Sequence, residues 1–456
     1  MHHHRQDNRV TQIIIALLIC LLLALIWHII PNIGVGLIAL LPALIVLSLK
    51  APFPLCLAFI CFSFFRLHEI FPVLSPLHIP QLLALATLFS LGCNLWLKNI
   101  SIFFSRELGL FSVFAILVTI GAFMATNRAL AMDSLIDTYA KIIVMVFAIS
   151  WLLSSRAQFK GLIITMILCG LVTSVCTLYN KINQLELVEG TRVTIGRSIG
   201  SMLGDPNDLS LVLLFPAGFC LAYALTRGVS PWVKTSCILI FLAIFSAILA
   251  TQSRGGLLGI IAVCGLFAWK NIKNKMLIIT LLPILILILI SLAGLDQRQS
   301  GAMQGMDIDD SAMGRLYAWD AAFNMALQHP LSGVGINNFI ANYFSYSQHW
   351  DGLNHAVHST WFGILAETGF LGLLIFIAII VRLFILSRNS LGYLEKSSKN
   401  YDPIIYANAQ AIQAGLLSFC VSGSFLTMGF TWPIYILLAV TIALDHYVKR
   451  QRAQQH

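Results

Sequence analysis

GRLYAWD at residues 314–320, HPLSGVG at 329–335, HAVHSTW at 355–361 and AETGFLG at 366–372 mark the one long polar excursion of this 456-residue chain. The excursion runs from Asp296 to Gly372, beginning as a polar loop and ending inside an apolar helix. Nearly everything on either side of it is hydrophobic. We therefore expect chemistry on a polar substrate to take place here, while the rest of the chain forms an apolar scaffold.

The composition is that of an integral membrane protein, because 58% of the residues are hydrophobic and 10% are charged, against about 25% charged in soluble domains. Many apolar runs approach the ~20 residues that cross a bilayer as a helix, and none shows the ten-residue alternation of a β-barrel. The first run lacks a small-residue cleavage site and reads as a retained span. We predict an all-α, polytopic transmembrane helix bundle of about 12–14 spans, with one long periplasmic loop containing short helices. The expected segments are 10–30, 33–49, 53–65, 80–98, 108–126, 139–154, 160–180, 207–226, 233–250, 255–269, 276–294, 359–386, 405–428 and 431–447.

The basic balance of the chain, a net charge of +9, is a topology signal. If the fourteen segments alternate with the N-terminus inside, about two thirds of the 28 lysines and arginines fall on one side. That excess marks the cytoplasmic side. The prediction is a bacterial inner-membrane protein with both termini cytoplasmic and no nucleic-acid partner. The polar loops 181–206, 251–254 and 295–358 are then periplasmic, and the connection 387–403 is cytoplasmic.

The long loop is expected to contain a helix over about 312–328. Leu316, Trp319, Phe323 and Leu327 recur at helical spacing and predict an apolar stripe, and Pro330 ends the pattern. Such a helix can lie on the membrane surface, cap a cavity between the spans, or simply pack against the bundle.

Three arginines are expected at the outer ends of spans: Arg197, Arg254 in Ser-Arg-Gly-Gly, and Arg315 at the start of the loop helix. The planar guanidinium suits phosphate bidentately, and a following helix N-terminus favours an anion. Gly255 and Gly256 allow a substrate or a neighbouring helix to approach the backbone. The arrangement fits a pyrophosphate at the outer leaflet, while structural ion pairs with nearby carboxylates are the alternative.

His355 and His358 precede the span 359–386, and a neutral histidine can accept a proton near pH 7. Their spacing of three could place them on one helical face, although a structural role is equally open. Glu367 is expected to be a buried carboxylate with a structural or substrate-binding role. No set of histidine, cysteine or acidic residues has convincing metal-ligand spacing, and the ten cysteines lie in apolar runs. We therefore expect no metal and no cofactor.

Taken together, these motifs resemble the O-antigen ligase/polymerase superfamily, the WaaL-like and Wzy-like membrane glycosyltransferases. The matching elements, over roughly 190–375, are Arg197 to Asn207, Ser253 to Gly256, Gly314 to Trp319, His329 to Gly335, His358 to Trp361, and Glu367 to Gly369. The chain departs from the family pattern at Asp205 and at Ser359, each of which stands where asparagine is usual.

The resemblance implies a glycan donor on undecaprenyl pyrophosphate and an inverting transfer, without metal, to an acceptor hydroxyl on lipid A-core or a similar lipid or protein. It implies His358 and Arg254 as catalytic residues. Arg197, Arg315, His355 and Glu367 would contact substrate. The donor, the acceptor and membrane lipids are the expected partners.

The alternatives are a Wzy-type repeat-unit polymerase, which shares the donor and the fold, and a transporter or flippase. A transporter would show charges deep within several spans and discontinuous helices at the midplane. The expected organisation is N-terminal transmembrane helices at 1–190, an O-antigen ligase-like core at 191–386, and C-terminal transmembrane helices at 387–456.

Overall fold

The computed structural model describes residues 52–71, 77–292, 308–396 and 402–454, with the single positions 46 and 74. These residues are almost entirely helical, and their only strands are two short ones that pair antiparallel. In chain order the elements are α3 (Pro52–Phe64), α4 (Leu67–Ile70), α5 (Ile79–Trp96), α6 (Arg106–Phe123), α7 (Arg128–Ser134), the π-helix η2 (Leu135–Tyr139), α8 (Ala140–Leu152), α9 (Arg156–Ile182), β1 (Leu187–Val188), β2 (Arg192–Val193), the 3₁₀ turns η3 (Arg197–Ile199) and η4 (Met202–Gly204), α10 (Pro206–Leu225), α11 (Pro231–Ala250), α12 (Arg254–Asn271), α13 (Lys275–Leu292), α15 (Ile308–Gln328), α16 (Phe339–Tyr346), α17 (Thr360–Lys396), α18 (Pro403–Gly423) and α19 (Trp432–Gln454).

The all-α, polytopic prediction is confirmed. Eight helices of the described ranges are long and apolar enough to cross a membrane: α5, α6, the run from α7 to α8, α9, α10, α11, α17 and α18. Each predicted segment from 53–65 onward falls on a helix. The predicted segments 10–30 and 33–49 lie outside the described residues apart from position 46, so the total of 12–14 spans stays a prediction.

Polar residues at the ends of the apolar runs fix where the helices begin. Ser105, Ser155, Ser230 and Asp402 are each the N-cap of a helix, and the side chain of each accepts a hydrogen bond from a backbone N–H of the first turn. At Ser155 the side chain of Gln158 completes a capping box. These contacts satisfy donors that a helix cannot pair internally.

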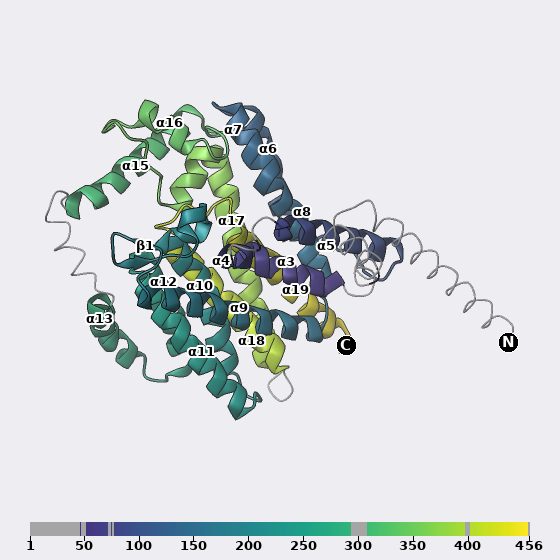
Figure 1. Ribbon diagram of the computed structural model, residues 1–456. Helices are drawn as coiled ribbons and strands as arrows, with labels where there is room; N and C mark the ends of the chain where they lie inside the picture. The colour runs from purple at the N-terminus through teal and green to yellow at the C-terminus, as the bar shows by residue number, and fades with distance from the viewer. Residues whose placement is uncertain are drawn as a thin grey trace, which may run out of the picture.

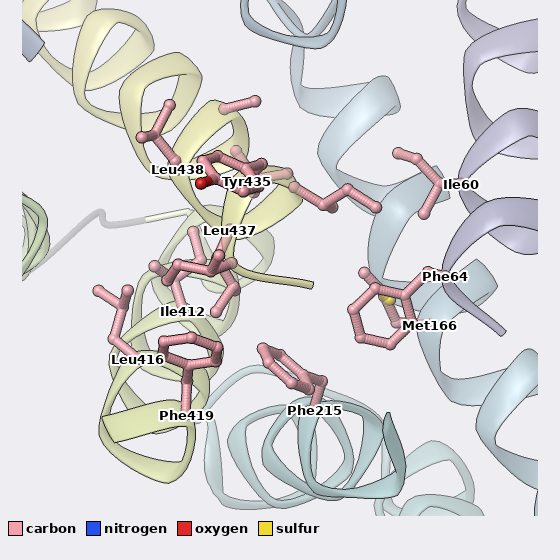
Figure 2. Packing of buried hydrophobic residues seen from close by; sticks show 14 of the residues in the cluster. Ile60, Phe64, Met166, Phe215, Ile412, Leu416, Phe419, Tyr435, Leu437 and Leu438 are labelled. Atoms are coloured by element: carbon pink, nitrogen blue, oxygen red, sulfur yellow. The ribbon is translucent and has the colours of Figure 1, made fainter. Parts of the chain in front are cut away.

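The core is built around α10, α18 and α19, whose buried faces meet α3 and α9 (Figure 2). The side chains drawn there come from α3 (Ile60, Phe64), α9 (Met166), α10 (Phe215), α18 (Ile412, Leu416, Phe419) and α19 (Tyr435, Leu437, Leu438). Close approach depends on small residues: a Cβ at Gly218 of α10 would lie 3.2 Å from the Cβ of Ala414 of α18. Small residues at helix interfaces are typical of membrane bundles, where van der Waals packing drives association.

The span 359–386 is broken, which the sequence pattern did not predict. Helix α17 contains Gly369 with φ 70° and ψ −172°, a conformation that only glycine adopts easily. The amide of Phe370 donates to the carbonyl of Pro330 (2.9 Å), and the amide of Val334 donates to the carbonyl of Ala366 (2.9 Å). Backbone groups freed by the break are thus satisfied by the segment that follows α15. Beyond the break, α17 runs on to Lys396, so much of the expected connection 387–403 is helical.

The helix expected at 312–328 is present as α15, and its apolar stripe is largely exposed. Leu316, Phe323 and Leu327 are exposed, and only Trp319 of the stripe is partly buried. The residues of α15 that pack inward are small or flexible: Ala318, Ala321, Ala322, Met325 and Ala326. They allow α15 to pack closely against α17. Figure 1 shows α15 and α16 together at one end of the molecule.

Candidate active site

The first turn of α10 ties the polar outer segments together. Asp205 caps this helix by accepting from the amide of Asn207 (2.7 Å). The Oδ1 atom of Asn207 accepts from Ser253 Oγ (2.8 Å) and from Arg192 Nη2 (3.0 Å). The start of α10, the strand β2 and the turn before α12 are therefore held by one asparagine side chain.

Arg192 is a residue that sequence reasoning missed. Its side chain is buried, and its Nε donates to the carbonyl of Thr251 (3.4 Å) in the turn before Arg254. A buried guanidinium is costly unless it is bonded. Arg192 follows Glu189 by three residues, and its Nη1 lies 3.7 Å from that carboxylate. The spacing was visible in the sequence, but the contacts with residues 207 and 251 were not.

Arg254 is the first residue of α12 and has an exposed side chain. Ser253 caps the helix by accepting from the amide of Gly256 (3.1 Å). Within the described part of the chain, the guanidinium of Arg254 forms no hydrogen bond or ion pair. The glycine pair serves helix packing: a Cβ at Gly256 would lie 2.4 Å from Ser210 Oγ on α10. These contacts fix the position of the turn, while the guanidinium of Arg254 stays exposed.

Arg197 is also exposed, on a loop held by two carboxylates. Glu186 Oε2 accepts from the amides of Arg197 (2.7 Å) and Ser198 (3.3 Å). Glu69 accepts a hydrogen bond from the hydroxyl of Ser201. The Nη1 atom of Arg197 donates to the carbonyl of Gly204 (3.1 Å), which directs the guanidinium toward the start of α10. Ion pairing with a described carboxylate, the structural alternative, is not observed for Arg197 or Arg254.

His358 lies just before α17 in the left-handed region, with φ 46°. Burial is the main reason that its pKa is lowered, and the positive charges of Arg315 and His355 lower it further, while Asp205 opposes them. His358 therefore interacts electrostatically with Arg315 and with Asp205, the N-cap of α10, and Asn207 connects that cap to the Arg254 turn.

The other two predicted site residues lie in different settings. His355 Nε2 lies 2.8 Å from Asp351 Oδ2 on an exposed loop, and this contact lowers the pKa of Asp351. Residues 351–359 are not helical, so His355 and His358 share no helical face. Glu367 is buried in α17 and accepts from the amide of Phe339 (3.2 Å), the first residue of α16. A carboxylate at a helix N-terminus is a stabilising arrangement, so Glu367 anchors α16.

Asn338, a second residue that the sequence did not single out, fixes the loop on α6 and α7. It is fully buried, and its Oδ1 accepts from the amide of Asn127 (2.8 Å) and from Thr126 Oγ1 (3.1 Å). Its Nδ2 donates to the carbonyls of Asn127 (3.2 Å) and Ile336 (3.0 Å). The partners at residues 126 and 127 lie more than 200 residues away, so no local pattern predicts them.

Comparison with known families agrees with this geometry: the Wzy_C family model, described as O-antigen ligase, matches residues 239–377. The match supports the resemblance of the motifs to the O-antigen ligase/polymerase superfamily. The matched region includes Arg254, Arg315, His355, His358 and Glu367, whereas Arg197 lies outside it. A search of the curated proteins found no match. The family and the eight apolar helices together identify a multi-pass membrane protein with a glycosyltransferase-type domain.

Proposed function

We propose that the protein transfers a glycan from undecaprenyl pyrophosphate to an acceptor hydroxyl at the periplasmic face of the bacterial inner membrane. The observation that carries this proposal is the set of groups around the first turn of α10. Arg197 is directed toward that turn, Arg254 is connected to it through Ser253, and His358 lies within reach of the charge of Asp205. Two guanidinium groups that can bind a pyrophosphate, and a histidine that can act as a neutral base, thus lie around the same helix turn.

In the proposed reaction, His358 removes the proton of the acceptor hydroxyl. The oxygen attacks the anomeric carbon from the face opposite the leaving group, so the configuration inverts. The bond between that carbon and the pyrophosphate oxygen breaks, and the pyrophosphate leaves with the electron pair. Arg254 and Arg197 stabilise the negative charge that develops on it. Because the pKa of His358 is lowered, its neutral, proton-accepting form prevails at neutral pH.

The transporter alternative predicts discontinuous helices, and α17 is discontinuous at Gly369. In transporters, the freed ends of such helices bind the substrate. Here the amide of Phe370 and the carbonyl of Ala366 are bonded to residues 330 and 334 instead. The break therefore serves loop docking, which favours the enzyme.

The test is performed with purified full-length protein in nanodiscs, with binding of the lipid-linked donor and glycan transfer measured separately. His358→Ala and His358→Gln should bind the donor normally and fail in transfer. Arg254→Lys keeps the charge but loses the bidentate fork, so it should lose much of the rate. In Arg254→Ala the rate of glycan transfer should fall roughly ten- to a hundred-fold or more, since a charge-assisted hydrogen bond contributes about 1.5–3 kcal/mol.

Arg128→Lys is the matched control, because Arg128 is likewise the exposed first residue of a helix, α7. It should transfer at the wild-type rate. Normal transfer by both His358→Ala and Arg254→Ala would refute the proposed site. Supplying two acceptors, a lipid A-core and a second lipid-linked repeat unit, tests ligase against polymerase: ligation requires transfer to the first and not to the second.

A further inference from the structure

A cavity lined by several charged side chains lies between the other ends of α12, α17 and α19. Its volume is about 1300 Å³, and it is lined by Trp269 and Lys270 of α12, by residues of α17 between Arg388 and Lys396, and by residues of α18 and α19. Lys270 follows Arg254 by sixteen residues on the same helix, which is ~24 Å along the axis. The cavity is therefore separated from the proposed active site by most of the thickness of a bilayer.

The cavity carries a surplus of positive charge. Five basic side chains line it (Lys270, Arg388, Lys396, Lys449 and Arg452), against two acidic ones, Glu395 and Asp445. Asp445 is neutralised by Lys449, whose Nζ lies 2.6 Å from Oδ2. The Oε1 atom of Glu395 accepts from the hydroxyl of Tyr406 (3.2 Å). The remaining basic groups exceed the remaining carboxylate in number.

Three of the cations are free to meet a ligand. In the part of the chain that the structure describes, Arg388 and Lys396 form no hydrogen bond or ion pair. Arg452 lies over the ring of Tyr393, with Cζ 5.8 Å from the centroid, which leaves its N–H groups uncommitted to a carboxylate. Positive charges that lie near one another at a membrane boundary repel each other, and placing them there costs free energy unless a counterion is bound.

We propose that this cavity binds the phosphate group of an anionic ligand, with an anionic phospholipid headgroup and a free phosphate as its two possible sources. Guanidinium forks match phosphate oxygens bidentately. Basic pockets between transmembrane helices also bind anionic headgroups. Trp269 and Tyr393 supply rings of the amphipathic kind found at the level of lipid headgroups. The site is independent of glycan transfer, because none of its residues belongs to the proposed active site.

The experiment uses full-length protein in phosphatidylcholine nanodiscs with two arms. In the first, phosphatidylglycerol is titrated into the discs and bound lipid is measured by native mass spectrometry. In the second, inorganic phosphate is titrated against discs of phosphatidylcholine alone by calorimetry. The variant Arg388→Gln/Lys396→Gln/Arg452→Gln should bind about a hundredfold more weakly than wild type in whichever arm binds, since each cation near the surface contributes about fivefold.

A triple variant of equal charge loss, Arg227→Gln/Lys234→Gln/Lys273→Gln, is the control, because its residues do not line the cavity. It should retain wild-type binding. The single variant Arg388→Gln replaces an exposed side chain without disturbing packing and should lose about fivefold. Unchanged binding by the cavity variants in both arms would overturn the proposal. Equal weakening by both triple variants would also overturn it, because binding would then be general surface attraction.

Discussion

Asn338 offers the sharpest test of how the outer loop is held. Replacing it by alanine removes three hydrogen bonds that join the loop to residues 126 and 127, and one to residue 336 within the loop, at 2.8–3.2 Å. The side chain is fully buried, so water does not restore these bonds without opening the contact. The helix bundle below the loop keeps all of its own packing.

At about 1 kcal/mol for each of the three joining bonds, the loss amounts to about 3 kcal/mol. If the loop opens locally, amide hydrogens of residues 329–346 should exchange roughly a hundredfold faster. Glycan transfer should fall as well, because the loop positions Arg315 and leads into His358. Exchange in α10 and α18 should be unchanged.

Asn342→Ala is the matched control, since Asn342 is only partly buried and its Nδ2 donates to Thr126 Oγ1 (2.7 Å) and to the carbonyl of Asn338 (2.8 Å). Water can replace these partners, so exchange should change little. The assay is hydrogen–deuterium exchange by mass spectrometry in nanodiscs, with transfer measured in parallel. Wild-type exchange of 329–346 in Asn338→Ala, or equal acceleration in both variants, would refute this account of loop docking.

Three further outcomes are expected. As the pH is raised, the transfer rate should increase with a midpoint below the ordinary histidine pKa of 6.5, because burial and Arg315 lower the pKa of His358. Arg315→Gln removes a positive charge and should move that midpoint to higher pH. An unmoved midpoint would contradict the assignment of His358 as the base. Gly369→Ala should lower the thermal midpoint strongly, because a Cβ there would lie 2.4 Å from the carbonyl oxygen of Pro330 at positive φ, whereas Gly265→Ala on open helix surface should not. Transfer should survive EDTA, and loss restored by one divalent ion would reveal a metal site.

Apolar length was sufficient to predict the helices of the bundle within the described ranges, because it depends on residues adjacent in sequence. The packing of α15 was not predictable in the same way. Helical periodicity selects large apolar residues such as Leu316, which are exposed, whereas close packing on α17 is achieved by alanines.

The sequence singles out a candidate site residue where a cation or a base stands next to a span, as for Arg197 and His358, and these assignments stay predictions. It does not single out residues that hold other residues in place. Arg192 and Asn338 act through partners tens or hundreds of residues away. For Glu367 a structural and a substrate-binding role were both open, and in the structure its carboxylate accepts from the amide that begins α16.

The backbone bonds between residues 330–334 and 366–370 make the outer loop and the second half of α17 a single assembly unit. In a bilayer the unpaired amide of Phe370 and carbonyl of Ala366 would each cost several kcal/mol, so α17 cannot reach its final form before the loop has docked. During synthesis the loop is made before the second half of α17, so it cannot dock until that later span has also been made. A chimera that exchanges residues 308–358 with a relative would separate these partners, whereas one that exchanges 308–396 would keep them together.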